Sequence, residues 1–67
     1  MNDIYVFIVR TNYPYRAQTT EEISFEKGQL IGVTLLTNDP WWMGSFVDRP
    51  FIHGLFPSNF VVREPDL

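Results

Sequence analysis

The sequence has no cysteine, few cationic side chains and no long apolar run. Without cysteine the chain forms neither a disulfide nor a thiolate metal site, so a hydrophobic core must hold the fold alone, as suits the reducing cytoplasm. The longest apolar run, residues 4–9, is too short to cross a bilayer or to act as a signal peptide. We therefore expect a soluble, cytoplasmic, monomeric domain without membrane insertion.

The scarcity of cations limits the kind of partner. Five Lys and Arg residues against eight Asp and Glu residues give a formal net charge of -3. This sign opposes docking to phosphate backbones or anionic lipid, so we expect no nucleic-acid partner and favour a cationic one. A nucleic-acid-binding barrel stays as a rival reading, although such a barrel needs a basic groove.

The sequence also lacks apolar residues at helical spacing over two turns, whereas β-branched and aromatic residues form short runs between turn residues. A chain of 67 residues makes one domain. We therefore expect an all-β fold, a small five-stranded barrel, with a short 3₁₀ turn after Pro57 and before the last strand. The expected strands are residues 4–11, 30–36, 41–47, 51–56 and 60–63.

Residues 12–26 form the least sheet-like stretch between two expected strands. Within it Ile23 and Phe25 alternate with polar residues, which predicts a short half-buried strand whose apolar side continues the core. Tyr13 and Tyr15 have the same two-residue spacing, so we expect their rings on one face.

Two adjacent tryptophans, Trp41 and Trp42, must point to opposite faces if their segment is extended. Trp41 shares its side with Ser45, and this serine-bearing side is the expected outward one. One interpretation is that both rings are only partly buried packing. However, Tyr13, Tyr15 and Phe60 also lie at loops or strand ends, and together with Trp41 they predict an aromatic platform on the surface.

Four motifs in order resemble the SH3 (Src homology 3) family over residues 7–63. They are TNYPY at 11–15, EEISFEKGQLIGV at 21–33, WWMG at 41–44 and GLFPSNFV at 54–61. The resemblance implies a five-stranded SH3-type barrel of two packed antiparallel sheets, as a single domain 1–67 taken from a longer protein. It also implies an RT loop, an n-Src loop and a distal hairpin, at residues 16–22, 37–40 and 48–50.

The resemblance further implies a non-catalytic scaffold, adaptor or signalling module whose partner is a proline-rich segment. Such domains bind Pro-x-x-Pro peptides as a polyproline II helix with a flanking Arg or Lys. The residues implied for peptide contact are Tyr13, Tyr15, Trp41, Pro57, Asn59 and Phe60. The acids implied for the basic residue of the ligand are Glu21, Glu22 and Asp39.

Several features depart from the family pattern. Phe60 stands where the family has Tyr, which removes a hydroxyl donor worth on the order of 1 kcal/mol. Pro14 stiffens the segment between the two tyrosines. The stretch 45–53 is about three residues longer than the commonest family form, adding Phe51 and Ile52. These departures keep open an alternative function, in which an SH3-like barrel binds a folded partner or its own chain through a surface that does not recognise polyproline.

Residues for catalysis or for metal binding are not apparent. His53 is the single histidine, and no cysteine or carboxylate stands around it at a metal-ligand spacing. Gly28 and Gly54 are turn glycines rather than part of a phosphate-binding loop. We expect no catalytic residue, no metal, no cofactor and no enzymatic activity.

Overall fold

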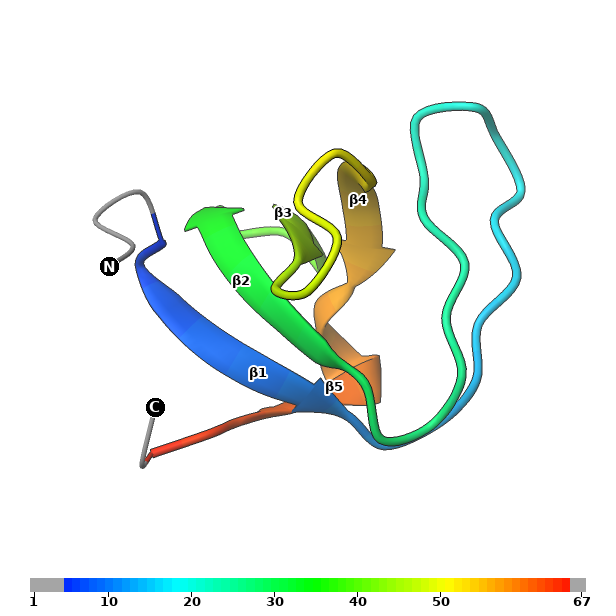
Figure 1. Ribbon diagram of the computed structural model, residues 1–67. Helices are drawn as coiled ribbons and strands as arrows, with labels where there is room; N and C mark the ends of the chain where they lie inside the picture. Colours follow the sequence, from blue (N-terminus) through cyan, green and yellow to red (C-terminus); the bar gives the residue numbers. More distant parts are fainter. Residues whose placement is uncertain (1–4, 66–67) are drawn as a thin grey trace.

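The computed structural model describes residues 5–65, which fold as five strands and one 3₁₀ turn (Figure 1). This confirms the predicted all-β fold and the turn before the last strand. The elements in chain order are β1 (Phe7–Thr11), β2 (Leu30–Leu35), β3 (Trp41–Phe46), β4 (His53–Pro57), η1 (Ser58–Phe60) and β5 (Val61–Arg63). The expected start of the first strand, Ile4, lies outside the described residues. No helix among residues 5–65 is long and apolar enough to cross a membrane.

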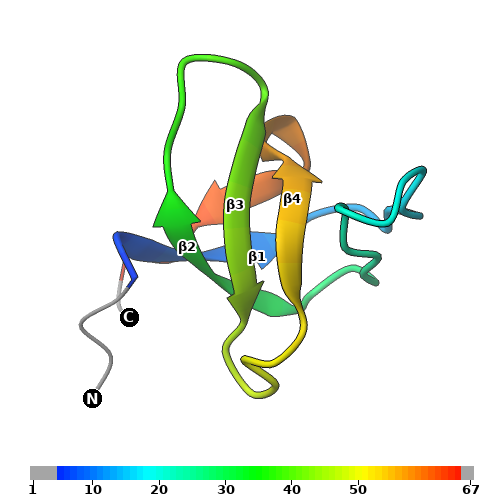
Figure 2. The same ribbon diagram turned by 90° about the horizontal axis from the view of Figure 1, so that it is seen from above.

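The five strands form one antiparallel sheet with the order β4-β3-β2-β1-β5. Figure 2 shows β3 and β4 running across β1, so the sheet bends over itself around the core. The two packed layers expected for the barrel are therefore two halves of a single bent sheet.

The connection between β3 and β4 is longer than predicted, because β4 begins at His53 rather than at Phe51. The backbone N–H of Ile52 donates to the Arg49 carbonyl at 2.9 Å, which places Phe51 in the turn. In the structure the distal hairpin therefore spans residues 47–52, wider than the implied 48–50, and the name is used below for this range. Similarly, the last strand starts at Val61, because Phe60 belongs to η1.

The segment between β1 and β2 closes the free edge of β4. The backbone N–H of Leu55 donates to the Glu21 carbonyl at 2.8 Å, and the Leu55 carbonyl accepts the backbone N–H of Ile23 at 2.9 Å. Tyr15 and Phe25 exchange two backbone hydrogen bonds of 2.8 and 2.9 Å. Ile23 and Phe25 are buried, as the alternation predicts, but the expected strand around them is reduced to isolated bridges.

The buried core consists of apolar side chains from β1 to β4 and from the segment between β1 and β2, and Phe60 and Val61 pack against it. Its buried members are Val9, Ile23, Phe25, Ile31, Val33, Phe46 and Phe56. Trp42 packs against this core, because its ring lies 5.8 Å from Phe7 and 6.5 Å from Phe56, centroid to centroid. This contact confirms the prediction that Trp42 points inward.

The serine on the outward side of β3 is not exposed, which corrects one expectation. Ser45 is only 4% exposed, because the Tyr5 ring covers this part of the sheet. The Tyr5 hydroxyl lies 2.8 Å from Ser45 Oγ, and its ring packs so closely over Gly32 that a Cβ there would lie 2.3 Å away. Gly32 pairs with Ser45 across the strands, so Tyr5 covers both residues.

Candidate functional site

Four aromatic rings lie in a row on one side of the bent sheet. Phe60 is 5.7 Å from Tyr13 and 5.5 Å from Tyr15, and Tyr15 is 6.1 Å from Trp41, centroid to centroid. Neighbouring rings meet edge to face, at 77°, 80° and 66°. The row is therefore ridged rather than flat. We call these four residues the aromatic row.

The aromatic row is assembled from three segments that are distant in the sequence. Tyr13 and Tyr15 lie beyond β1, Trp41 begins β3, and Phe60 ends η1. Tyr13 is the most open of the four at 57% exposure. Trp41 is half-buried, so it is less open than its predicted outward direction suggested.

Pro57 and Asn59 lie beside the aromatic row. Pro57 is buried and pairs with Trp41 across β3 and β4, so it supports the indole from the neighbouring strand. Asn59 is exposed in η1, next to Phe60. All six residues predicted for peptide contact therefore belong to the row or adjoin one of its members.

The n-Src loop holds Trp41 in place through Asp39. Asp39 Oδ1 accepts hydrogen bonds from the Trp41 backbone N–H and from Thr37 Oγ1, both at 2.8 Å. The Trp41 bond, and after it the Thr37 bond, lowers the pKa of Asp39 below its ordinary value. The loop also connects to η1, because Ser58 donates its N–H to the Pro40 carbonyl at 2.7 Å.

The two adjacent glutamates of the RT loop differ in their surroundings. Glu22 is half-buried and accepts hydrogen bonds from the Tyr15 hydroxyl, from the Gln18 N–H at 2.9 Å and from Thr19 Oγ1 at 3.2 Å. Glu21 is exposed, and Thr20 Oγ1 approaches its carboxylate at 3.2 Å. Glu22 therefore fixes the loop, whereas Glu21 presents its charge to solvent.

The hydrogen bond between Tyr15 and Glu22 shifts both groups away from their ordinary acidities. It is the largest cause that lowers the pKa of Glu22, followed by the bond from the Gln18 backbone. The same bond is the largest cause that raises the pKa of Tyr15. Glu22 and Asp39 thus stay ionised next to two rings that are 6.1 Å apart. The intramolecular bonds of these two acids were not predicted, because residue spacing alone does not show which loop groups face a carboxylate.

Both lowered pKa values predict a loss of stability in acid. A carboxylate whose pKa is lower in the folded state stabilises the fold above its unfolded pKa, about 4 for Asp and Glu, and this stabilisation disappears as the pH falls through the folded value. We expect the midpoint of urea unfolding to be constant near neutral pH and to fall below about pH 4. In the E22Q/D39N double variant the midpoint of urea unfolding should fall less between pH 6 and pH 2 than in the original protein. An equal fall in both proteins would contradict the role of Glu22 and Asp39 in acid stability.

Among residues 5–65, no three His, Asp, Glu or Cys side chains gather closely enough to hold a metal ion. What the site offers is a ridged row of rings, edged by carboxylates and by the Asn59 amide. A small bent β-sheet with such a surface defines the chain as a β-barrel interaction domain.

Comparisons with known proteins agree with this class. Residues 12–62 match the family model described as "Variant SH3 domain". The chain is 50% identical over 50 residues to Cell division control protein 15 of Schizosaccharomyces pombe, covering 73% of this chain and 5% of that protein. It is 40% identical over 55 residues to human Intersectin-1, covering 82% of this chain and 3% of that protein.

Two solved structures have the same fold. The Acanthamoeba myosin I SH3 domain bound to Acan125 superposes with a TM-score of 0.76 at 31% identity, covering 87% of this chain and 95% of that one. The C-terminal SH3 domain of Myosin IB from Entamoeba histolytica, bound to a peptide of EhFP10(GEF), gives 0.75 at 32% identity, covering 90% and 85%.

The chain belongs to the SH3 family, and the resemblance predicted from its four motifs is confirmed. SH3 domains are generally interaction modules without catalytic activity. The chain spans only a small fraction of the length of the curated relatives named above.

Proposed function

We propose that this domain is a non-catalytic module that binds proline-rich segments of the Pro-x-x-Pro type through the aromatic row. The observation that carries the proposal is the continuous contact of Tyr13, Phe60, Tyr15 and Trp41, with Pro57 behind the indole. Solved relatives of the same family that are described as bound to a peptide, or to Acan125, add support.

The shape of the aromatic row suits a polyproline II helix. This helix has three residues per turn and no internal hydrogen bonds, so its carbonyls are free to accept, and it loses little entropy on binding. Rings that meet edge to face leave furrows for pyrrolidine side chains. The Asn59 amide and the Trp41 indole N–H are donors for the carbonyls of the ligand.

The carboxylates of the RT and n-Src loops favour a basic residue in the ligand. Glu21 is the open acid of the RT loop, while Glu22 and Asp39 keep their charge because hydrogen bonds lower their pKa values. An arginine that pairs with an RT-loop carboxylate and stacks on the Trp41 indole combines two weak contacts of about 0.5–1 kcal/mol each. In this proposal Glu22 and Asp39 also act as positioning residues for Tyr15 and Trp41.

We propose that the domain is monomeric and acts within a longer cytoplasmic scaffold, adaptor or signalling protein. The small share of its curated relatives that it covers supports this setting. The shallow ridged surface fits weak, reversible binding, with a Kd in the micromolar range, about -7 to -8 kcal/mol.

Charge reversal of the open acid tests the proposed function. A blocked peptide with a Pro-x-x-Pro core and a terminal arginine is titrated against its alanine counterpart, and we expect the arginine form to bind roughly 3- to 10-fold more tightly. E21K should abolish this difference, measured by Trp fluorescence. The control D48K makes the same charge change on the distal hairpin, where Asp48 has an 80% exposed side chain, and should preserve the difference. If E21K and D48K lose this difference equally, the acids act only through the net charge of the domain and not through a specific contact with the arginine.

The second candidate function is binding of a folded partner, or of the chain itself, through a surface other than the aromatic row. The 76% exposure of Phe51 in the distal hairpin favours it. Amide shifts near Phe51 during the peptide titration, with none at Tyr15, Trp41 and Asn59, would select this function. Affinity for single-stranded DNA that rises at low salt would revive the nucleic-acid reading.

A further inference from the structure

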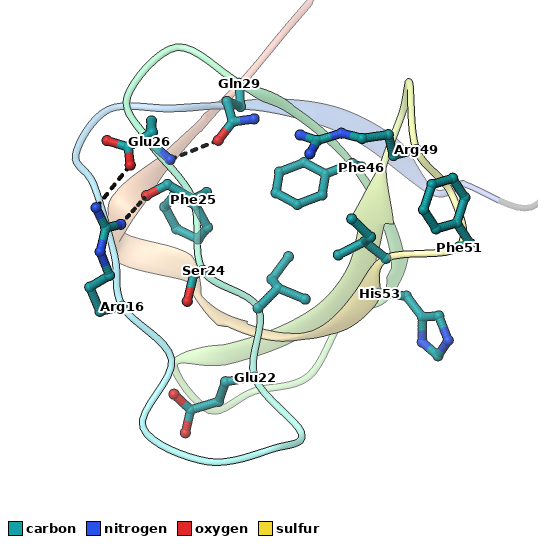
Figure 3. A pocket seen from close by; sticks show the side chains of 12 residues that line it. Arg16, Glu22, Ser24, Phe25, Glu26, Gln29, Phe46, Arg49, Phe51 and His53 are labelled. Carbon is teal, nitrogen blue, oxygen red and sulfur yellow. Dashed lines mark hydrogen bonds and ion pairs between the residues drawn. The ribbon is translucent and has the colours of Figure 1, made fainter.

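A hollow of about 740 Å³ lies between the base of the RT loop and the distal hairpin (Figure 3). Its size is within the range of small-ligand sites, about 300–1,000 Å³. Its floor is formed by Ile23, Phe25 and Phe46, which belong to the core. No ring of the aromatic row lines it, and Glu22, which accepts the Tyr15 hydroxyl, is the residue that the hollow shares with the surroundings of the row.

The distal hairpin forms one wall of the hollow. Phe51 and Ile52 of this hairpin both line it. Phe51 is 76% exposed, which is a large apolar surface for a small domain to leave in water. Phe51 of the distal hairpin therefore gives the hollow an aromatic rim.

The charges around the hollow are unevenly distributed. On one side the guanidinium of Arg16 pairs with Glu26 at 2.8 Å, so their charges offset each other. Glu22 also lines the hollow, but its carboxylate accepts the Tyr15 hydroxyl and RT-loop groups. These acids are therefore already engaged with partners of their own.

The opposite side of the hollow is cationic and aromatic. The Arg49 guanidinium lies 4.5 Å from the centroid of the Phe46 ring, and its Asp48 partner is 3.6 Å away with an 80% exposed carboxylate. Figure 3 shows Arg49, Phe51 and His53 together on this side, away from Arg16 and Glu26. A guanidinium stacked on a ring keeps its edge free for a carboxylate.

We propose that the hollow is a second binding site, for a peptide segment that carries an apolar side chain next to a carboxylate. The apolar side chain lies against Phe51 and Ile52, and the carboxylate pairs with Arg49. This charge preference is opposite to the one proposed for the acid-edged aromatic row. The proposal does not depend on polyproline binding.

The test is an NMR titration with the blocked peptide Gly-Glu-Phe-Leu-Glu-Gly. We expect amide shifts at Arg49, Phe51 and His53, a Kd of about 0.1–1 mM, and no shift at Trp41 or Asn59. R49E should weaken this binding at least about fivefold. The matched control is R63E, because the Arg63 guanidinium also lies 4.5 Å from a ring centroid, that of Phe7, but does not line the hollow.

Several outcomes would overturn the proposal. They are the absence of shifts at millimolar peptide, equal weakening by R49E and R63E, and unchanged binding of a peptide with glutamine in place of both glutamates. Concentration-dependent shifts at Phe51 without peptide would assign the hollow to a second copy of the chain. Binding that W41A abolishes would place the peptide on the aromatic row, whereas binding that W41A leaves unchanged separates this site from the proposed function.

Discussion

Replacing Trp41 with alanine should weaken binding of the arginine-bearing Pro-x-x-Pro peptide by about 10- to 100-fold. The indole ends the aromatic row, and its ring centroid lies 6.1 Å from that of Tyr15. Its removal takes away a wall of the furrow for proline and the stacking surface for arginine. Isothermal titration calorimetry of the folded variant measures the change.

The neighbouring Trp42 provides the matched control. Trp42→Ala removes the same side chain from the core side of β3, where it packs against Phe7 and Phe56. We expect this variant to lose about 2–4 kcal/mol of unfolding free energy while its folded fraction binds the peptide normally. Trp41→Ala should show the reverse pattern. Normal peptide affinity in Trp41→Ala would remove the aromatic row from the proposed function.

Replacing Phe56 with alanine should have the largest effect on stability. Phe56 is 0% exposed at the centre of the core, and truncation of such a side chain costs about 3–5 kcal/mol. A domain of this length is stable by only about 3–10 kcal/mol, so the variant should lose a large part of its stability. Thermal unfolding followed by near-UV circular dichroism measures the loss.

Phe51 offers the same chemical change at an exposed position. Because its ring is 76% exposed, Phe51→Ala should change the free energy of unfolding by no more than about 0.5 kcal/mol. Comparable destabilisation by both substitutions would mean that the distal hairpin packs more tightly than its exposure indicates. An unchanged stability in Phe56→Ala would contradict the description of the core.

Local patterns in the sequence determined the class of the fold. Short β-branched and aromatic runs between turn residues predicted the strands, because a strand exposes its side chains alternately to two faces. The same alternation predicted that Trp42 points inward and that Ile23 and Phe25 are buried, as the structure has them. The order of the four motifs identified the family, since chance matches do not recur in sequence and at the right spacing.

Only the tertiary structure decided which groups meet across long stretches of chain. It covered Ser45 with Tyr5, 40 residues away, and it turned Glu22 toward Tyr15 and Asp39 toward the Trp41 backbone. It also joined core floor, RT-loop base and distal hairpin into a hollow. Periodicity assigns a side chain to a face of its own strand, but what lies over that face depends on how the sheet bends and on which loop closes its edge.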